Sequence, residues 1–201
     1  GKAVQTVNPP NSSVGSSQVS ADLITGQTAL GATPADTDEL LISDAGTLKR
    51  VDYSYLKSAN TPAFFAYKTS NQSISNTTTT KVTFESELVD SGSVYDTSNS
   101  RFTPAVAGYY IIGAKWRYDT STNFSGAQFR VNRNGSVISK VTFVNDEASG
   151  MTFNQMFYSD ADDYFEMFAY QNSGGSVTIN GNSTYPEQDQ AVFYAYRIIG
   201  I

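Results

Sequence analysis

Four segments of the chain carry apolar side chains at both alternating positions of an extended strand: residues 64–67, 109–118, 164–170 and 192–199. An antiparallel strand with one solvated face should instead alternate apolar and polar residues. We therefore expect these four strands to form one sheet that is apolar on both faces. One face can pack on the domain core, and the other needs a partner surface, for which a second copy of the chain is the simplest candidate.

Shorter strand patterns occupy the remainder of residues 61–201. Residues 127–132 alternate apolar and polar side chains, Asn134-Gly135 predicts a tight hairpin turn, and residues 137–144 predict the returning strand. Further short strands are expected at 81–85, 151–158 and 177–179. Many short strands joined by turn residues, in a chain with 13 Tyr and 12 Phe, predict an all-β sandwich or barrel.

The first 60 residues differ from the rest of the chain. Residues 1–30 are rich in Ser, Thr, Gly, Asn and Pro, and we expect an extended low-complexity stalk or attachment segment there. Residues 31–60 form a small module in which strands at 39–43 and 47–51 make a hairpin, followed by a helical turn from Asp52. Because the module has too few apolar residues for its own core, we expect it to order only by packing on other copies.

Composition excludes several classes of function. The chain has 201 residues and contains neither Cys nor His, which rules out disulfides, catalytic triads that use His, and the usual zinc sites. Its net charge of −6, with only 16% charged residues, argues against a nucleic-acid surface. No apolar run is long enough to span a bilayer, so membrane insertion is not expected, and we expect no cofactor.

The sequence of residues 61–201 resembles complement-component-1q-type domains of the TNF-like superfamily. The resemblance is carried by Tyr95-Asp96, Arg101-Phe102-Thr103-Pro104, Val106-Ala107-Gly108-Tyr109-Tyr110, Asp163-Tyr164-Phe165-Glu166, the closing residues 192–198 and the opening residues 62–66. Asp162 and Ala195 depart from the family pattern, which usually has Gly there. The resemblance implies a two-sheet jelly-roll knob that forms a tight homotrimer through its inner sheet.

A second resemblance covers the N-terminal part. Residues 23–30 and 38–51 are similar to modules of tailed-phage fibres and other virion appendage proteins, in which small trimeric units precede a tip domain. The collagen repeat expected of animal relatives is missing. The resemblance implies a bacteriophage virion location on the particle surface, with residues 1–60 joining the knob to other virion structural proteins.

Candidate site residues fall into two groups. Trimer-interface or core positions are Phe64, Tyr110, Ile112, Phe168, Tyr170, Phe193 and Tyr196. Candidate receptor-binding loops are polar and turn-rich, span 119–125, 145–149 and 182–190, and include Asn123, Phe124, Asn145, Asn182 and Tyr185. Phe124 is an aromatic residue in a hydrophilic loop that could stack on a sugar, with packing back onto the sandwich as the alternative.

Two other patterns leave alternatives open. Asp160, Asp162 and Asp163, with Glu166, could ligate calcium or act as a glycosidase acid pair, although a solvated charged turn explains them as well. Tyr164, Phe168, Tyr170, Tyr194 and Tyr196 could form a carbohydrate platform, but their position within strands favours interface or core packing.

These patterns together lead to a function hypothesis. We expect a non-enzymatic, homotrimeric fibre or appendage tip that binds host surface glycan or protein during attachment. One alternative is a purely structural trimerisation or capping domain of a virion protein. A glycan-degrading enzyme of the tailspike type is the other.

Overall fold

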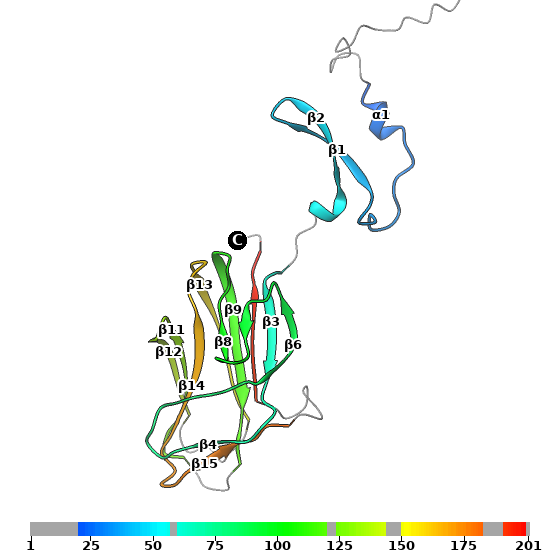
Figure 1. Cartoon of the computed structure of the whole chain (residues 1–201). Coiled ribbons are helices and arrows are strands. Elements are labelled where there is room, and N and C mark those ends of the chain that lie inside the picture. The colour runs from blue at the N-terminus through cyan, green and yellow to red at the C-terminus, as the bar shows by residue number, and fades with distance from the viewer. Residues whose placement is uncertain (1–19, 57–59, 120–123, 144–149, 183–190, 200–201) are drawn as a thin grey trace, which may run out of the picture. The chain divides into compact units, whose positions relative to one another are not determined.

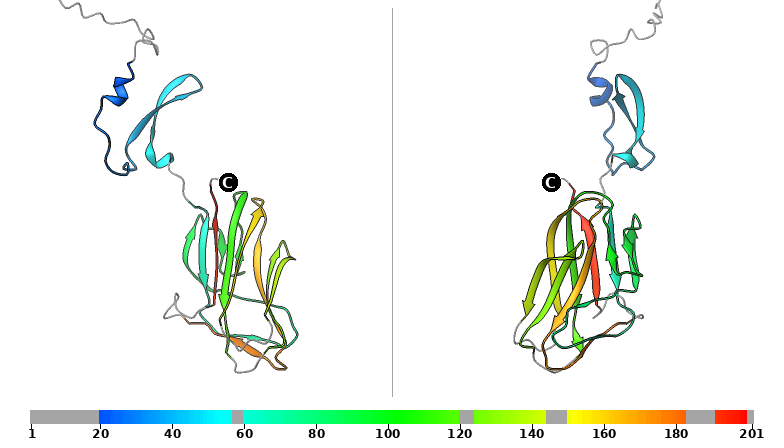
Figure 2. Two further views of the ribbon diagram at one scale, coloured as in Figure 1. Left: turned by 180° about the vertical axis from the view of Figure 1, so that it is seen from behind. Right: turned by 60° about the vertical axis from the view of Figure 1, so that its left-hand side comes forward.

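The computed structural model describes residues 20–56, 60–119, 124–143, 150–182 and 191–199. The chain divides into two compact units, residues 1–57 and 58–201, and each is described by itself (Figures 1 and 2). This division separates the predicted N-terminal segments from the predicted knob.

Unit 1 is built on one β-hairpin. Strands β1 (Glu39–Asp44) and β2 (Thr47–Asp52) pair antiparallel around a turn at Ala45 and Gly46, both with positive φ, and a 3-10 turn, η1 (Tyr53–Tyr55), follows. The predicted hairpin and helical turn are confirmed. The expectation of an extended segment up to residue 30 is wrong at one place, because a four-residue helix, α1 (Asp22–Thr25), forms there. The Ser20 hydroxyl accepts a hydrogen bond from the Asp22 amide, which satisfies one free donor at the start of this helix.

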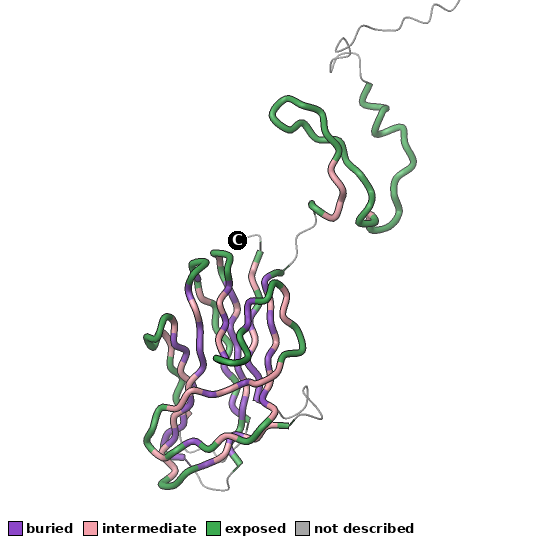
Figure 3. Tube along the Cα trace, in the orientation of Figure 1, coloured by how far each residue is buried: buried purple, intermediate pink, exposed green. Residues whose placement is uncertain are grey.

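No residue between 20 and 56 is buried (Figure 3). Most apolar side chains of the unit are exposed, among them Leu23, Ile24, Leu41, Leu48 and Tyr55. An isolated two-stranded hairpin is at best marginally stable in water, so this unit lacks a core of its own.

One of the two larger sheets of unit 2 is a five-stranded antiparallel sheet in the order β13-β9-β16-β3-β6 (Figure 1). Its strands are β3 (Ala63–Tyr67), β6 (Ser86–Ser91), β9 (Gly108–Trp116), β13 (Met151–Ser159) and β16 (Val192–Arg197).

A six-stranded sheet packs against it in the order β12-β11-β14-β8-β7, with β5 also paired to β14. Its strands are β5 (Thr80–Lys81), β7 (Tyr95–Asp96), β8 (Arg101–Phe102), β11 (Ala127–Arg133), β12 (Ser136–Phe143) and β14 (Phe165–Gln171). A small third sheet joins β4 (Gln72–Ile74), β10 (Tyr118–Asp119) and β15 (Val177–Ile179).

The strand order of the two larger sheets is that of a jelly roll. Of the eight strands β3, β8, β9, β11, β12, β13, β14 and β16, the first, eighth, third and sixth share one sheet, and the second, seventh, fourth and fifth share the other. This connectivity is a double Greek key. The expected all-β jelly-roll sandwich is therefore confirmed, whereas its homotrimeric state stays a prediction.

One sequence-based expectation about the sheets is wrong. Residues 109–116 lie in β9, and the 64–67 and 192–197 segments lie in the same five-stranded sheet, but residues 165–170 lie in β14 of the other sheet. The outward rings of β14 are half-covered by long polar side chains from β11 rather than by another sheet. Arg130, for example, lies over the Tyr170 ring at 5.1 Å.

Buried residues recur along the strands of the two larger sheets (Figure 3), and their side chains form an aromatic core between the sheets. Phe193 contacts the rings of Phe64, Phe84 and Tyr95, with centroids 4.9, 5.6 and 6.0 Å away. The hydroxyl of buried Tyr110 donates to the Val106 carbonyl at 2.7 Å, so its polar atom is satisfied. These contacts join the sheets into one packed body.

The predicted turn between β11 and β12 is also confirmed. Asn134 and Gly135 have φ of 53° and 79°, as a two-residue hairpin turn requires. The Asn134 side chain donates to Asp163 and accepts from the Tyr164 amide, which fastens this turn to the start of β14.

Candidate functional site

The five-stranded sheet turns an apolar surface away from the core. We call the apolar part of this surface the aromatic face, and it comprises Phe65, Tyr67, Tyr109, Ile111, Gly113, Met156, Tyr158, Tyr194 and Tyr196, while Lys115, Thr152 and Asn154 border it on the same side of the sheet. All of its side chains are half-buried or exposed, and Tyr196 is 39% exposed. Of the predicted interface-or-core residues, Tyr196 lies on this face, while Phe64, Tyr110, Ile112 and Phe193 lie in the core.

Rings on the aromatic face pack on one another across strands. Tyr109 of β9 meets Tyr158 of β13 edge to face at 5.3 Å, and Phe65 of β3 stacks with Tyr194 of β16 at 6.2 Å. Burial raises the pKa of the Tyr194 hydroxyl, and the neighbouring Tyr196 adds to this effect. The face is therefore an ordered surface rather than a set of isolated apolar residues.

Gly113 makes this arrangement possible. A Cβ atom at Gly113 would lie 2.3 Å from Cζ of Tyr194, the residue directly opposite on β16. The missing side chain at Gly113 leaves the space that the end of the Tyr194 side chain occupies. A large, exposed apolar surface of this kind typically marks a protein association site.

The candidate binding loops adjoin the opposite end of the sandwich from the start of β3. Trp116 at the end of β9 pairs with Met151 at the start of β13, and Val192 at the start of β16 pairs beside them (Figure 1). The strand ends that flank all three predicted loops thus meet at one end of the knob.

The described loop residues do not all support recognition. Phe124 is only 3% exposed and packs against Tyr118 at 5.0 Å, so of its two expected roles the structure has packing back onto the sandwich and not an exposed sugar-binding position. The apolar ring is more stable inside the sandwich than in a polar loop. Asn182 is exposed. Asn123, Asn145 and Tyr185 lie outside the described residues.

The acidic turn before β14 is structural. The Asp163 carboxylate accepts hydrogen bonds from the side-chain amide of Asn134 and from the backbone N–H of Asp160. It also lies 3.6 Å from Nη1 of Arg133. Across the described ranges, no group of three acidic side chains could hold a metal ion. The Asp163 carboxylate is thus occupied by hydrogen bonds within the protein. Exposed Asp162 does not complete the calcium site that the sequence suggested as one alternative.

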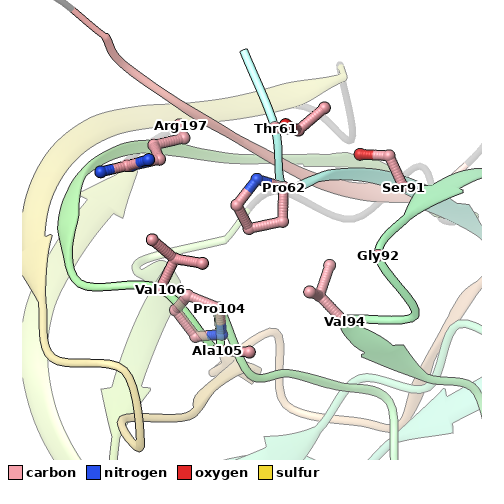
Figure 4. Close-up of a pocket in the computed structure, with 9 residues that line it drawn as sticks. All are labelled: Thr61, Pro62, Ser91, Gly92, Val94, Pro104, Ala105, Val106 and Arg197. Carbon is pink, nitrogen blue, oxygen red and sulfur yellow. The ribbon is translucent and has the colours of Figure 1, made fainter. Parts of the chain in front are cut away.

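A cavity of about 450 Å³ lies at the other end of the sandwich, near the start of β3 (Figure 4). Its lining is Thr61, Pro62, Ser91, Gly92, Val94, Pro104, Ala105, Val106 and Arg197. The guanidinium of Arg197 points away from Pro62 and Val94, and its Nη2 donates to the Ala107 carbonyl. No carboxylate lines the cavity, so it offers no acid pair for glycoside hydrolysis.

Comparisons with known proteins give limited similarity. No family model matches the chain. The uncharacterized protein YqcC of Bacillus subtilis strain 168 is 28% identical over 108 residues, which are 50% of this chain and 30% of that protein. The chain thus spans less than a third of that relative's length.

Two solved structures are similar to the knob. The globular domain of zebrafish complement 1qA protein has a TM-score of 0.48 and 13% identity, covering 68% of this chain and 97% of that one. Murine APRIL has a TM-score of 0.49 and 10% identity, covering 68% and 99%. The assignment of a jelly roll rests on the order and pairing of the strands themselves.

Several surface residues escaped the sequence analysis. Lys81, Arg101, Arg130 and Lys140 gather on the outer face of the six-stranded sheet although they are far apart in sequence. A plain two-residue turn at 134–135 would pair Arg130 with Ser139. An irregularity between Val131 and Asn132 instead pairs Arg130 with Lys140. No sequence pattern predicts this change in the register between β11 and β12. No helix among the described residues is long and apolar enough to cross a membrane.

Proposed function

We propose that the chain is the tip portion of a homotrimeric virion fibre or appendage of a bacteriophage, with a non-enzymatic role in attachment to the host surface. The aromatic face is the observation that carries this proposal. It is apolar, ordered and uncovered within one copy, and association with further copies would remove it from water. The trimeric state and the virion context come from the resemblances of residues 61–201 and residues 23–51.

The hairpin of unit 1 supports assembly from several copies. Its apolar residues are exposed on both faces, because Leu41 and Leu48 lie on one side and Leu40 and Ile42 on the other. We infer that three hairpins cover one another and that residues 1–60 join the knob to other virion structural proteins. No cofactor is required for either role.

A purely structural cap is the second candidate function. The burial of Phe124 favours it, because this residue was the strongest candidate for stacking on a host glycan. The enzymatic alternative has less support, since Asp163 and Glu166 are both held in ion pairs with basic residues.

Two measurements test the proposal. Sedimentation equilibrium of the full chain should give the mass of a trimer at micromolar concentration, and a stable monomer would contradict the assembly. Loops 119–125, 145–149 and 182–190 are then exchanged one at a time for Gly/Ser segments of equal length. Binding of each labelled variant to Bacillus subtilis cells, the source of the sequence relative, is compared with that of the parent chain. A folded trimer that loses attachment supports adhesion, and full attachment by all three variants favours the cap.

A further inference from the structure

The outer face of the six-stranded sheet carries a row of positive charge. Lys140 of β12 stands opposite Arg130 of β11, Arg130 stands opposite Phe168 of β14, and Phe168 stands opposite Lys81 of β5. All four side chains point to the same side, because directly paired residues share a face. Together with Arg101 of β8, we call this surface the basic face.

Aromatic rings alternate with the cations on the basic face. The guanidinium of Arg101 lies 4.0 Å above the Tyr164 ring, and that of Arg130 lies 5.1 Å from the Tyr170 ring. Phe168 is half-buried between Arg130 and Lys81. Stacking holds a guanidinium parallel to the surface while its N–H edge remains able to donate.

The positive charge is only partly neutralised. Glu166 accepts from both Lys81 (2.7 Å) and Arg101 (3.0 Å) through its Oε1 atom. Asp96 stands opposite Arg101 at the β7 edge, where its carboxylate is bound within its own turn.

The two remaining cations have no acidic partner in the part of the chain that the structure describes. Arg130 donates to Thr79 and Gln128, and exposed Lys140 forms no ion pair with a residue of the described ranges. A surplus of cations therefore collects on one face of a chain whose net charge is −6.

We propose that the basic face binds an anionic polysaccharide. This inference rests on the proposed attachment function and names its ligand class, but it places the contact on the side of the sandwich rather than on the end loops. Lys140 and Arg130 supply charge for carboxylate, phosphate or sulfate groups. The half-exposed rings of Phe168 and Tyr170 supply apolar surface for the C–H face of a sugar.

The geometry favours a polymer over a single sugar. Lys140 and Lys81 are three strand spacings apart, which is about 14 Å across the sheet. A ligand with charges repeated along a chain can meet both ends of this row at once, and the sum of weak contacts then gives useful affinity. The face also stays accessible in the proposed trimer, because the aromatic face lies on the other sheet.

Binding of the full chain to four immobilised polymers tests the proposal. Polygalacturonate and poly-L-glutamate both carry carboxylates, but only the first has sugar rings. Dextran sulfate and neutral dextran share their sugar and differ in charge. We expect binding to polygalacturonate or dextran sulfate that weakens with added salt, none to dextran, and weaker binding to poly-L-glutamate.

Variants locate the contact. Arg130→Gln with Lys140→Gln should weaken polysaccharide binding by on the order of tenfold. The matched control, Lys49→Gln with Arg117→Gln, removes the same charge from other surfaces and should leave binding unchanged. Phe168→Thr should abolish the preference for polygalacturonate over poly-L-glutamate, provided that its circular dichroism spectrum matches that of the parent chain.

Each alternative result overturns the proposal. If neither charged polysaccharide binds, the proposed ligand class is wrong. If the two double variants lose binding equally, the basic face is not the binding site. Equal affinity for polygalacturonate and poly-L-glutamate reduces the face to a non-specific polyanion surface, which tight binding of double-stranded DNA would also indicate. If cells are bound while no polysaccharide is, the attachment function survives without this inference.

Discussion

The two outward faces of the sandwich differ although the two inward faces are alike. Inside, both sheets contribute rings to one core, as Phe193 of β16 and Phe102 of β8 illustrate. Outside, the five-stranded sheet presents several tyrosines, of which Tyr194 packs over Gly113, while the six-stranded sheet places Arg130 over the Tyr170 ring. Burial therefore selects the same chemistry on both inward faces, whereas the outward faces differ in how many charged side chains lie among their rings.

The comparison of β9 with β14 shows why the sequence of one strand does not reveal the chemistry of the surface to which its outward side chains belong. Both have apolar side chains on two faces, and from this pattern we expected them to lie in one sheet. Tyr109 on β9 has Tyr158 of β13 as its neighbour, so apolar surface accumulates there. Phe168 on β14 has Arg130 and Lys81 as neighbours, so apolar surface is interrupted by charge. Cross-strand partners decide whether an outward ring belongs to an apolar or to a charged surface.

The largest effect is expected where the two sheets share the core. Phe193→Asp should prevent folding, because it removes a fully buried ring and places an unpaired carboxylate among aromatic side chains. The cost is roughly 5 kcal/mol or more, comparable with the stability of a small domain. Near-ultraviolet circular dichroism and thermal unfolding measure it. Thr142→Asp, on an exposed position of β12, serves as the control and should fold normally.

A charge on the aromatic face should separate assembly from folding. Ile111→Asp is expected to yield a folded monomer, since Ile111 is half-buried on the outward side of β9. Sedimentation equilibrium at micromolar concentration measures the mass, and near-ultraviolet circular dichroism checks the fold. If this variant remains a trimer while folded, the aromatic face is not the assembly surface.

A smaller effect is expected from the ion pair between buried Lys68 and half-buried Glu85. Nζ of fully buried Lys68 donates to Thr83 and to Glu85, at 2.9 Å for the carboxylate. Burial raises the pKa of Glu85, but hydrogen bonds from Lys68, Thr69 and Thr83 outweigh this, so the net pKa is lowered. A carboxyl with a lowered folded-state pKa stabilises the fold above its unfolded pKa, and this contribution is lost as pH falls through the folded pKa.

Glu85→Gln should therefore lower the free energy of unfolding by about 2 kcal/mol at pH 7, with a difference that shrinks towards pH 3. Chemical denaturation at both pH values measures this. The control is Glu87→Gln on the exposed side of β6. A pH-independent difference would mean that the loss comes from packing rather than from charge.

The smallest effect concerns the ring above Gly113. Gly113→Ala should cost about 1 kcal/mol, because the new methyl group displaces the far end of the Tyr194 side chain. The same substitution in a Tyr194→Ala background should cost much less, since the three atoms nearest to the Cβ belong to the Tyr194 side chain. Thermal unfolding of the four chains in this cycle gives the coupling energy. Equal costs in the two backgrounds would contradict this packing.

Local features of the sequence predicted most of the sandwich. The alternation of residues 127–132 and the Asn134-Gly135 turn act through nearest neighbours, so β11, β12 and their connection follow from the sequence. For Phe124 the sequence left open both stacking on a sugar and packing back onto the sandwich, because the choice depends on its contact with Tyr118 in the folded chain. The register that pairs Arg130 with Lys140 depends on a one-residue irregularity, and no composition rule places it.

The lack of any buried residue in the hairpin of unit 1 has a consequence for the order of events during assembly. Hairpins tethered to associated knobs would be held near one another at a local concentration on the order of millimolar, whatever the concentration of free chains. Even weak mutual contacts among Leu40, Leu41 and Leu48 would then suffice to order them. Knob association would come first and hairpin ordering second. Cleavage by a protease between residues 39 and 52 would accordingly be fast in single chains and slow in assembled ones, which makes this hairpin an internal reporter of completed assembly.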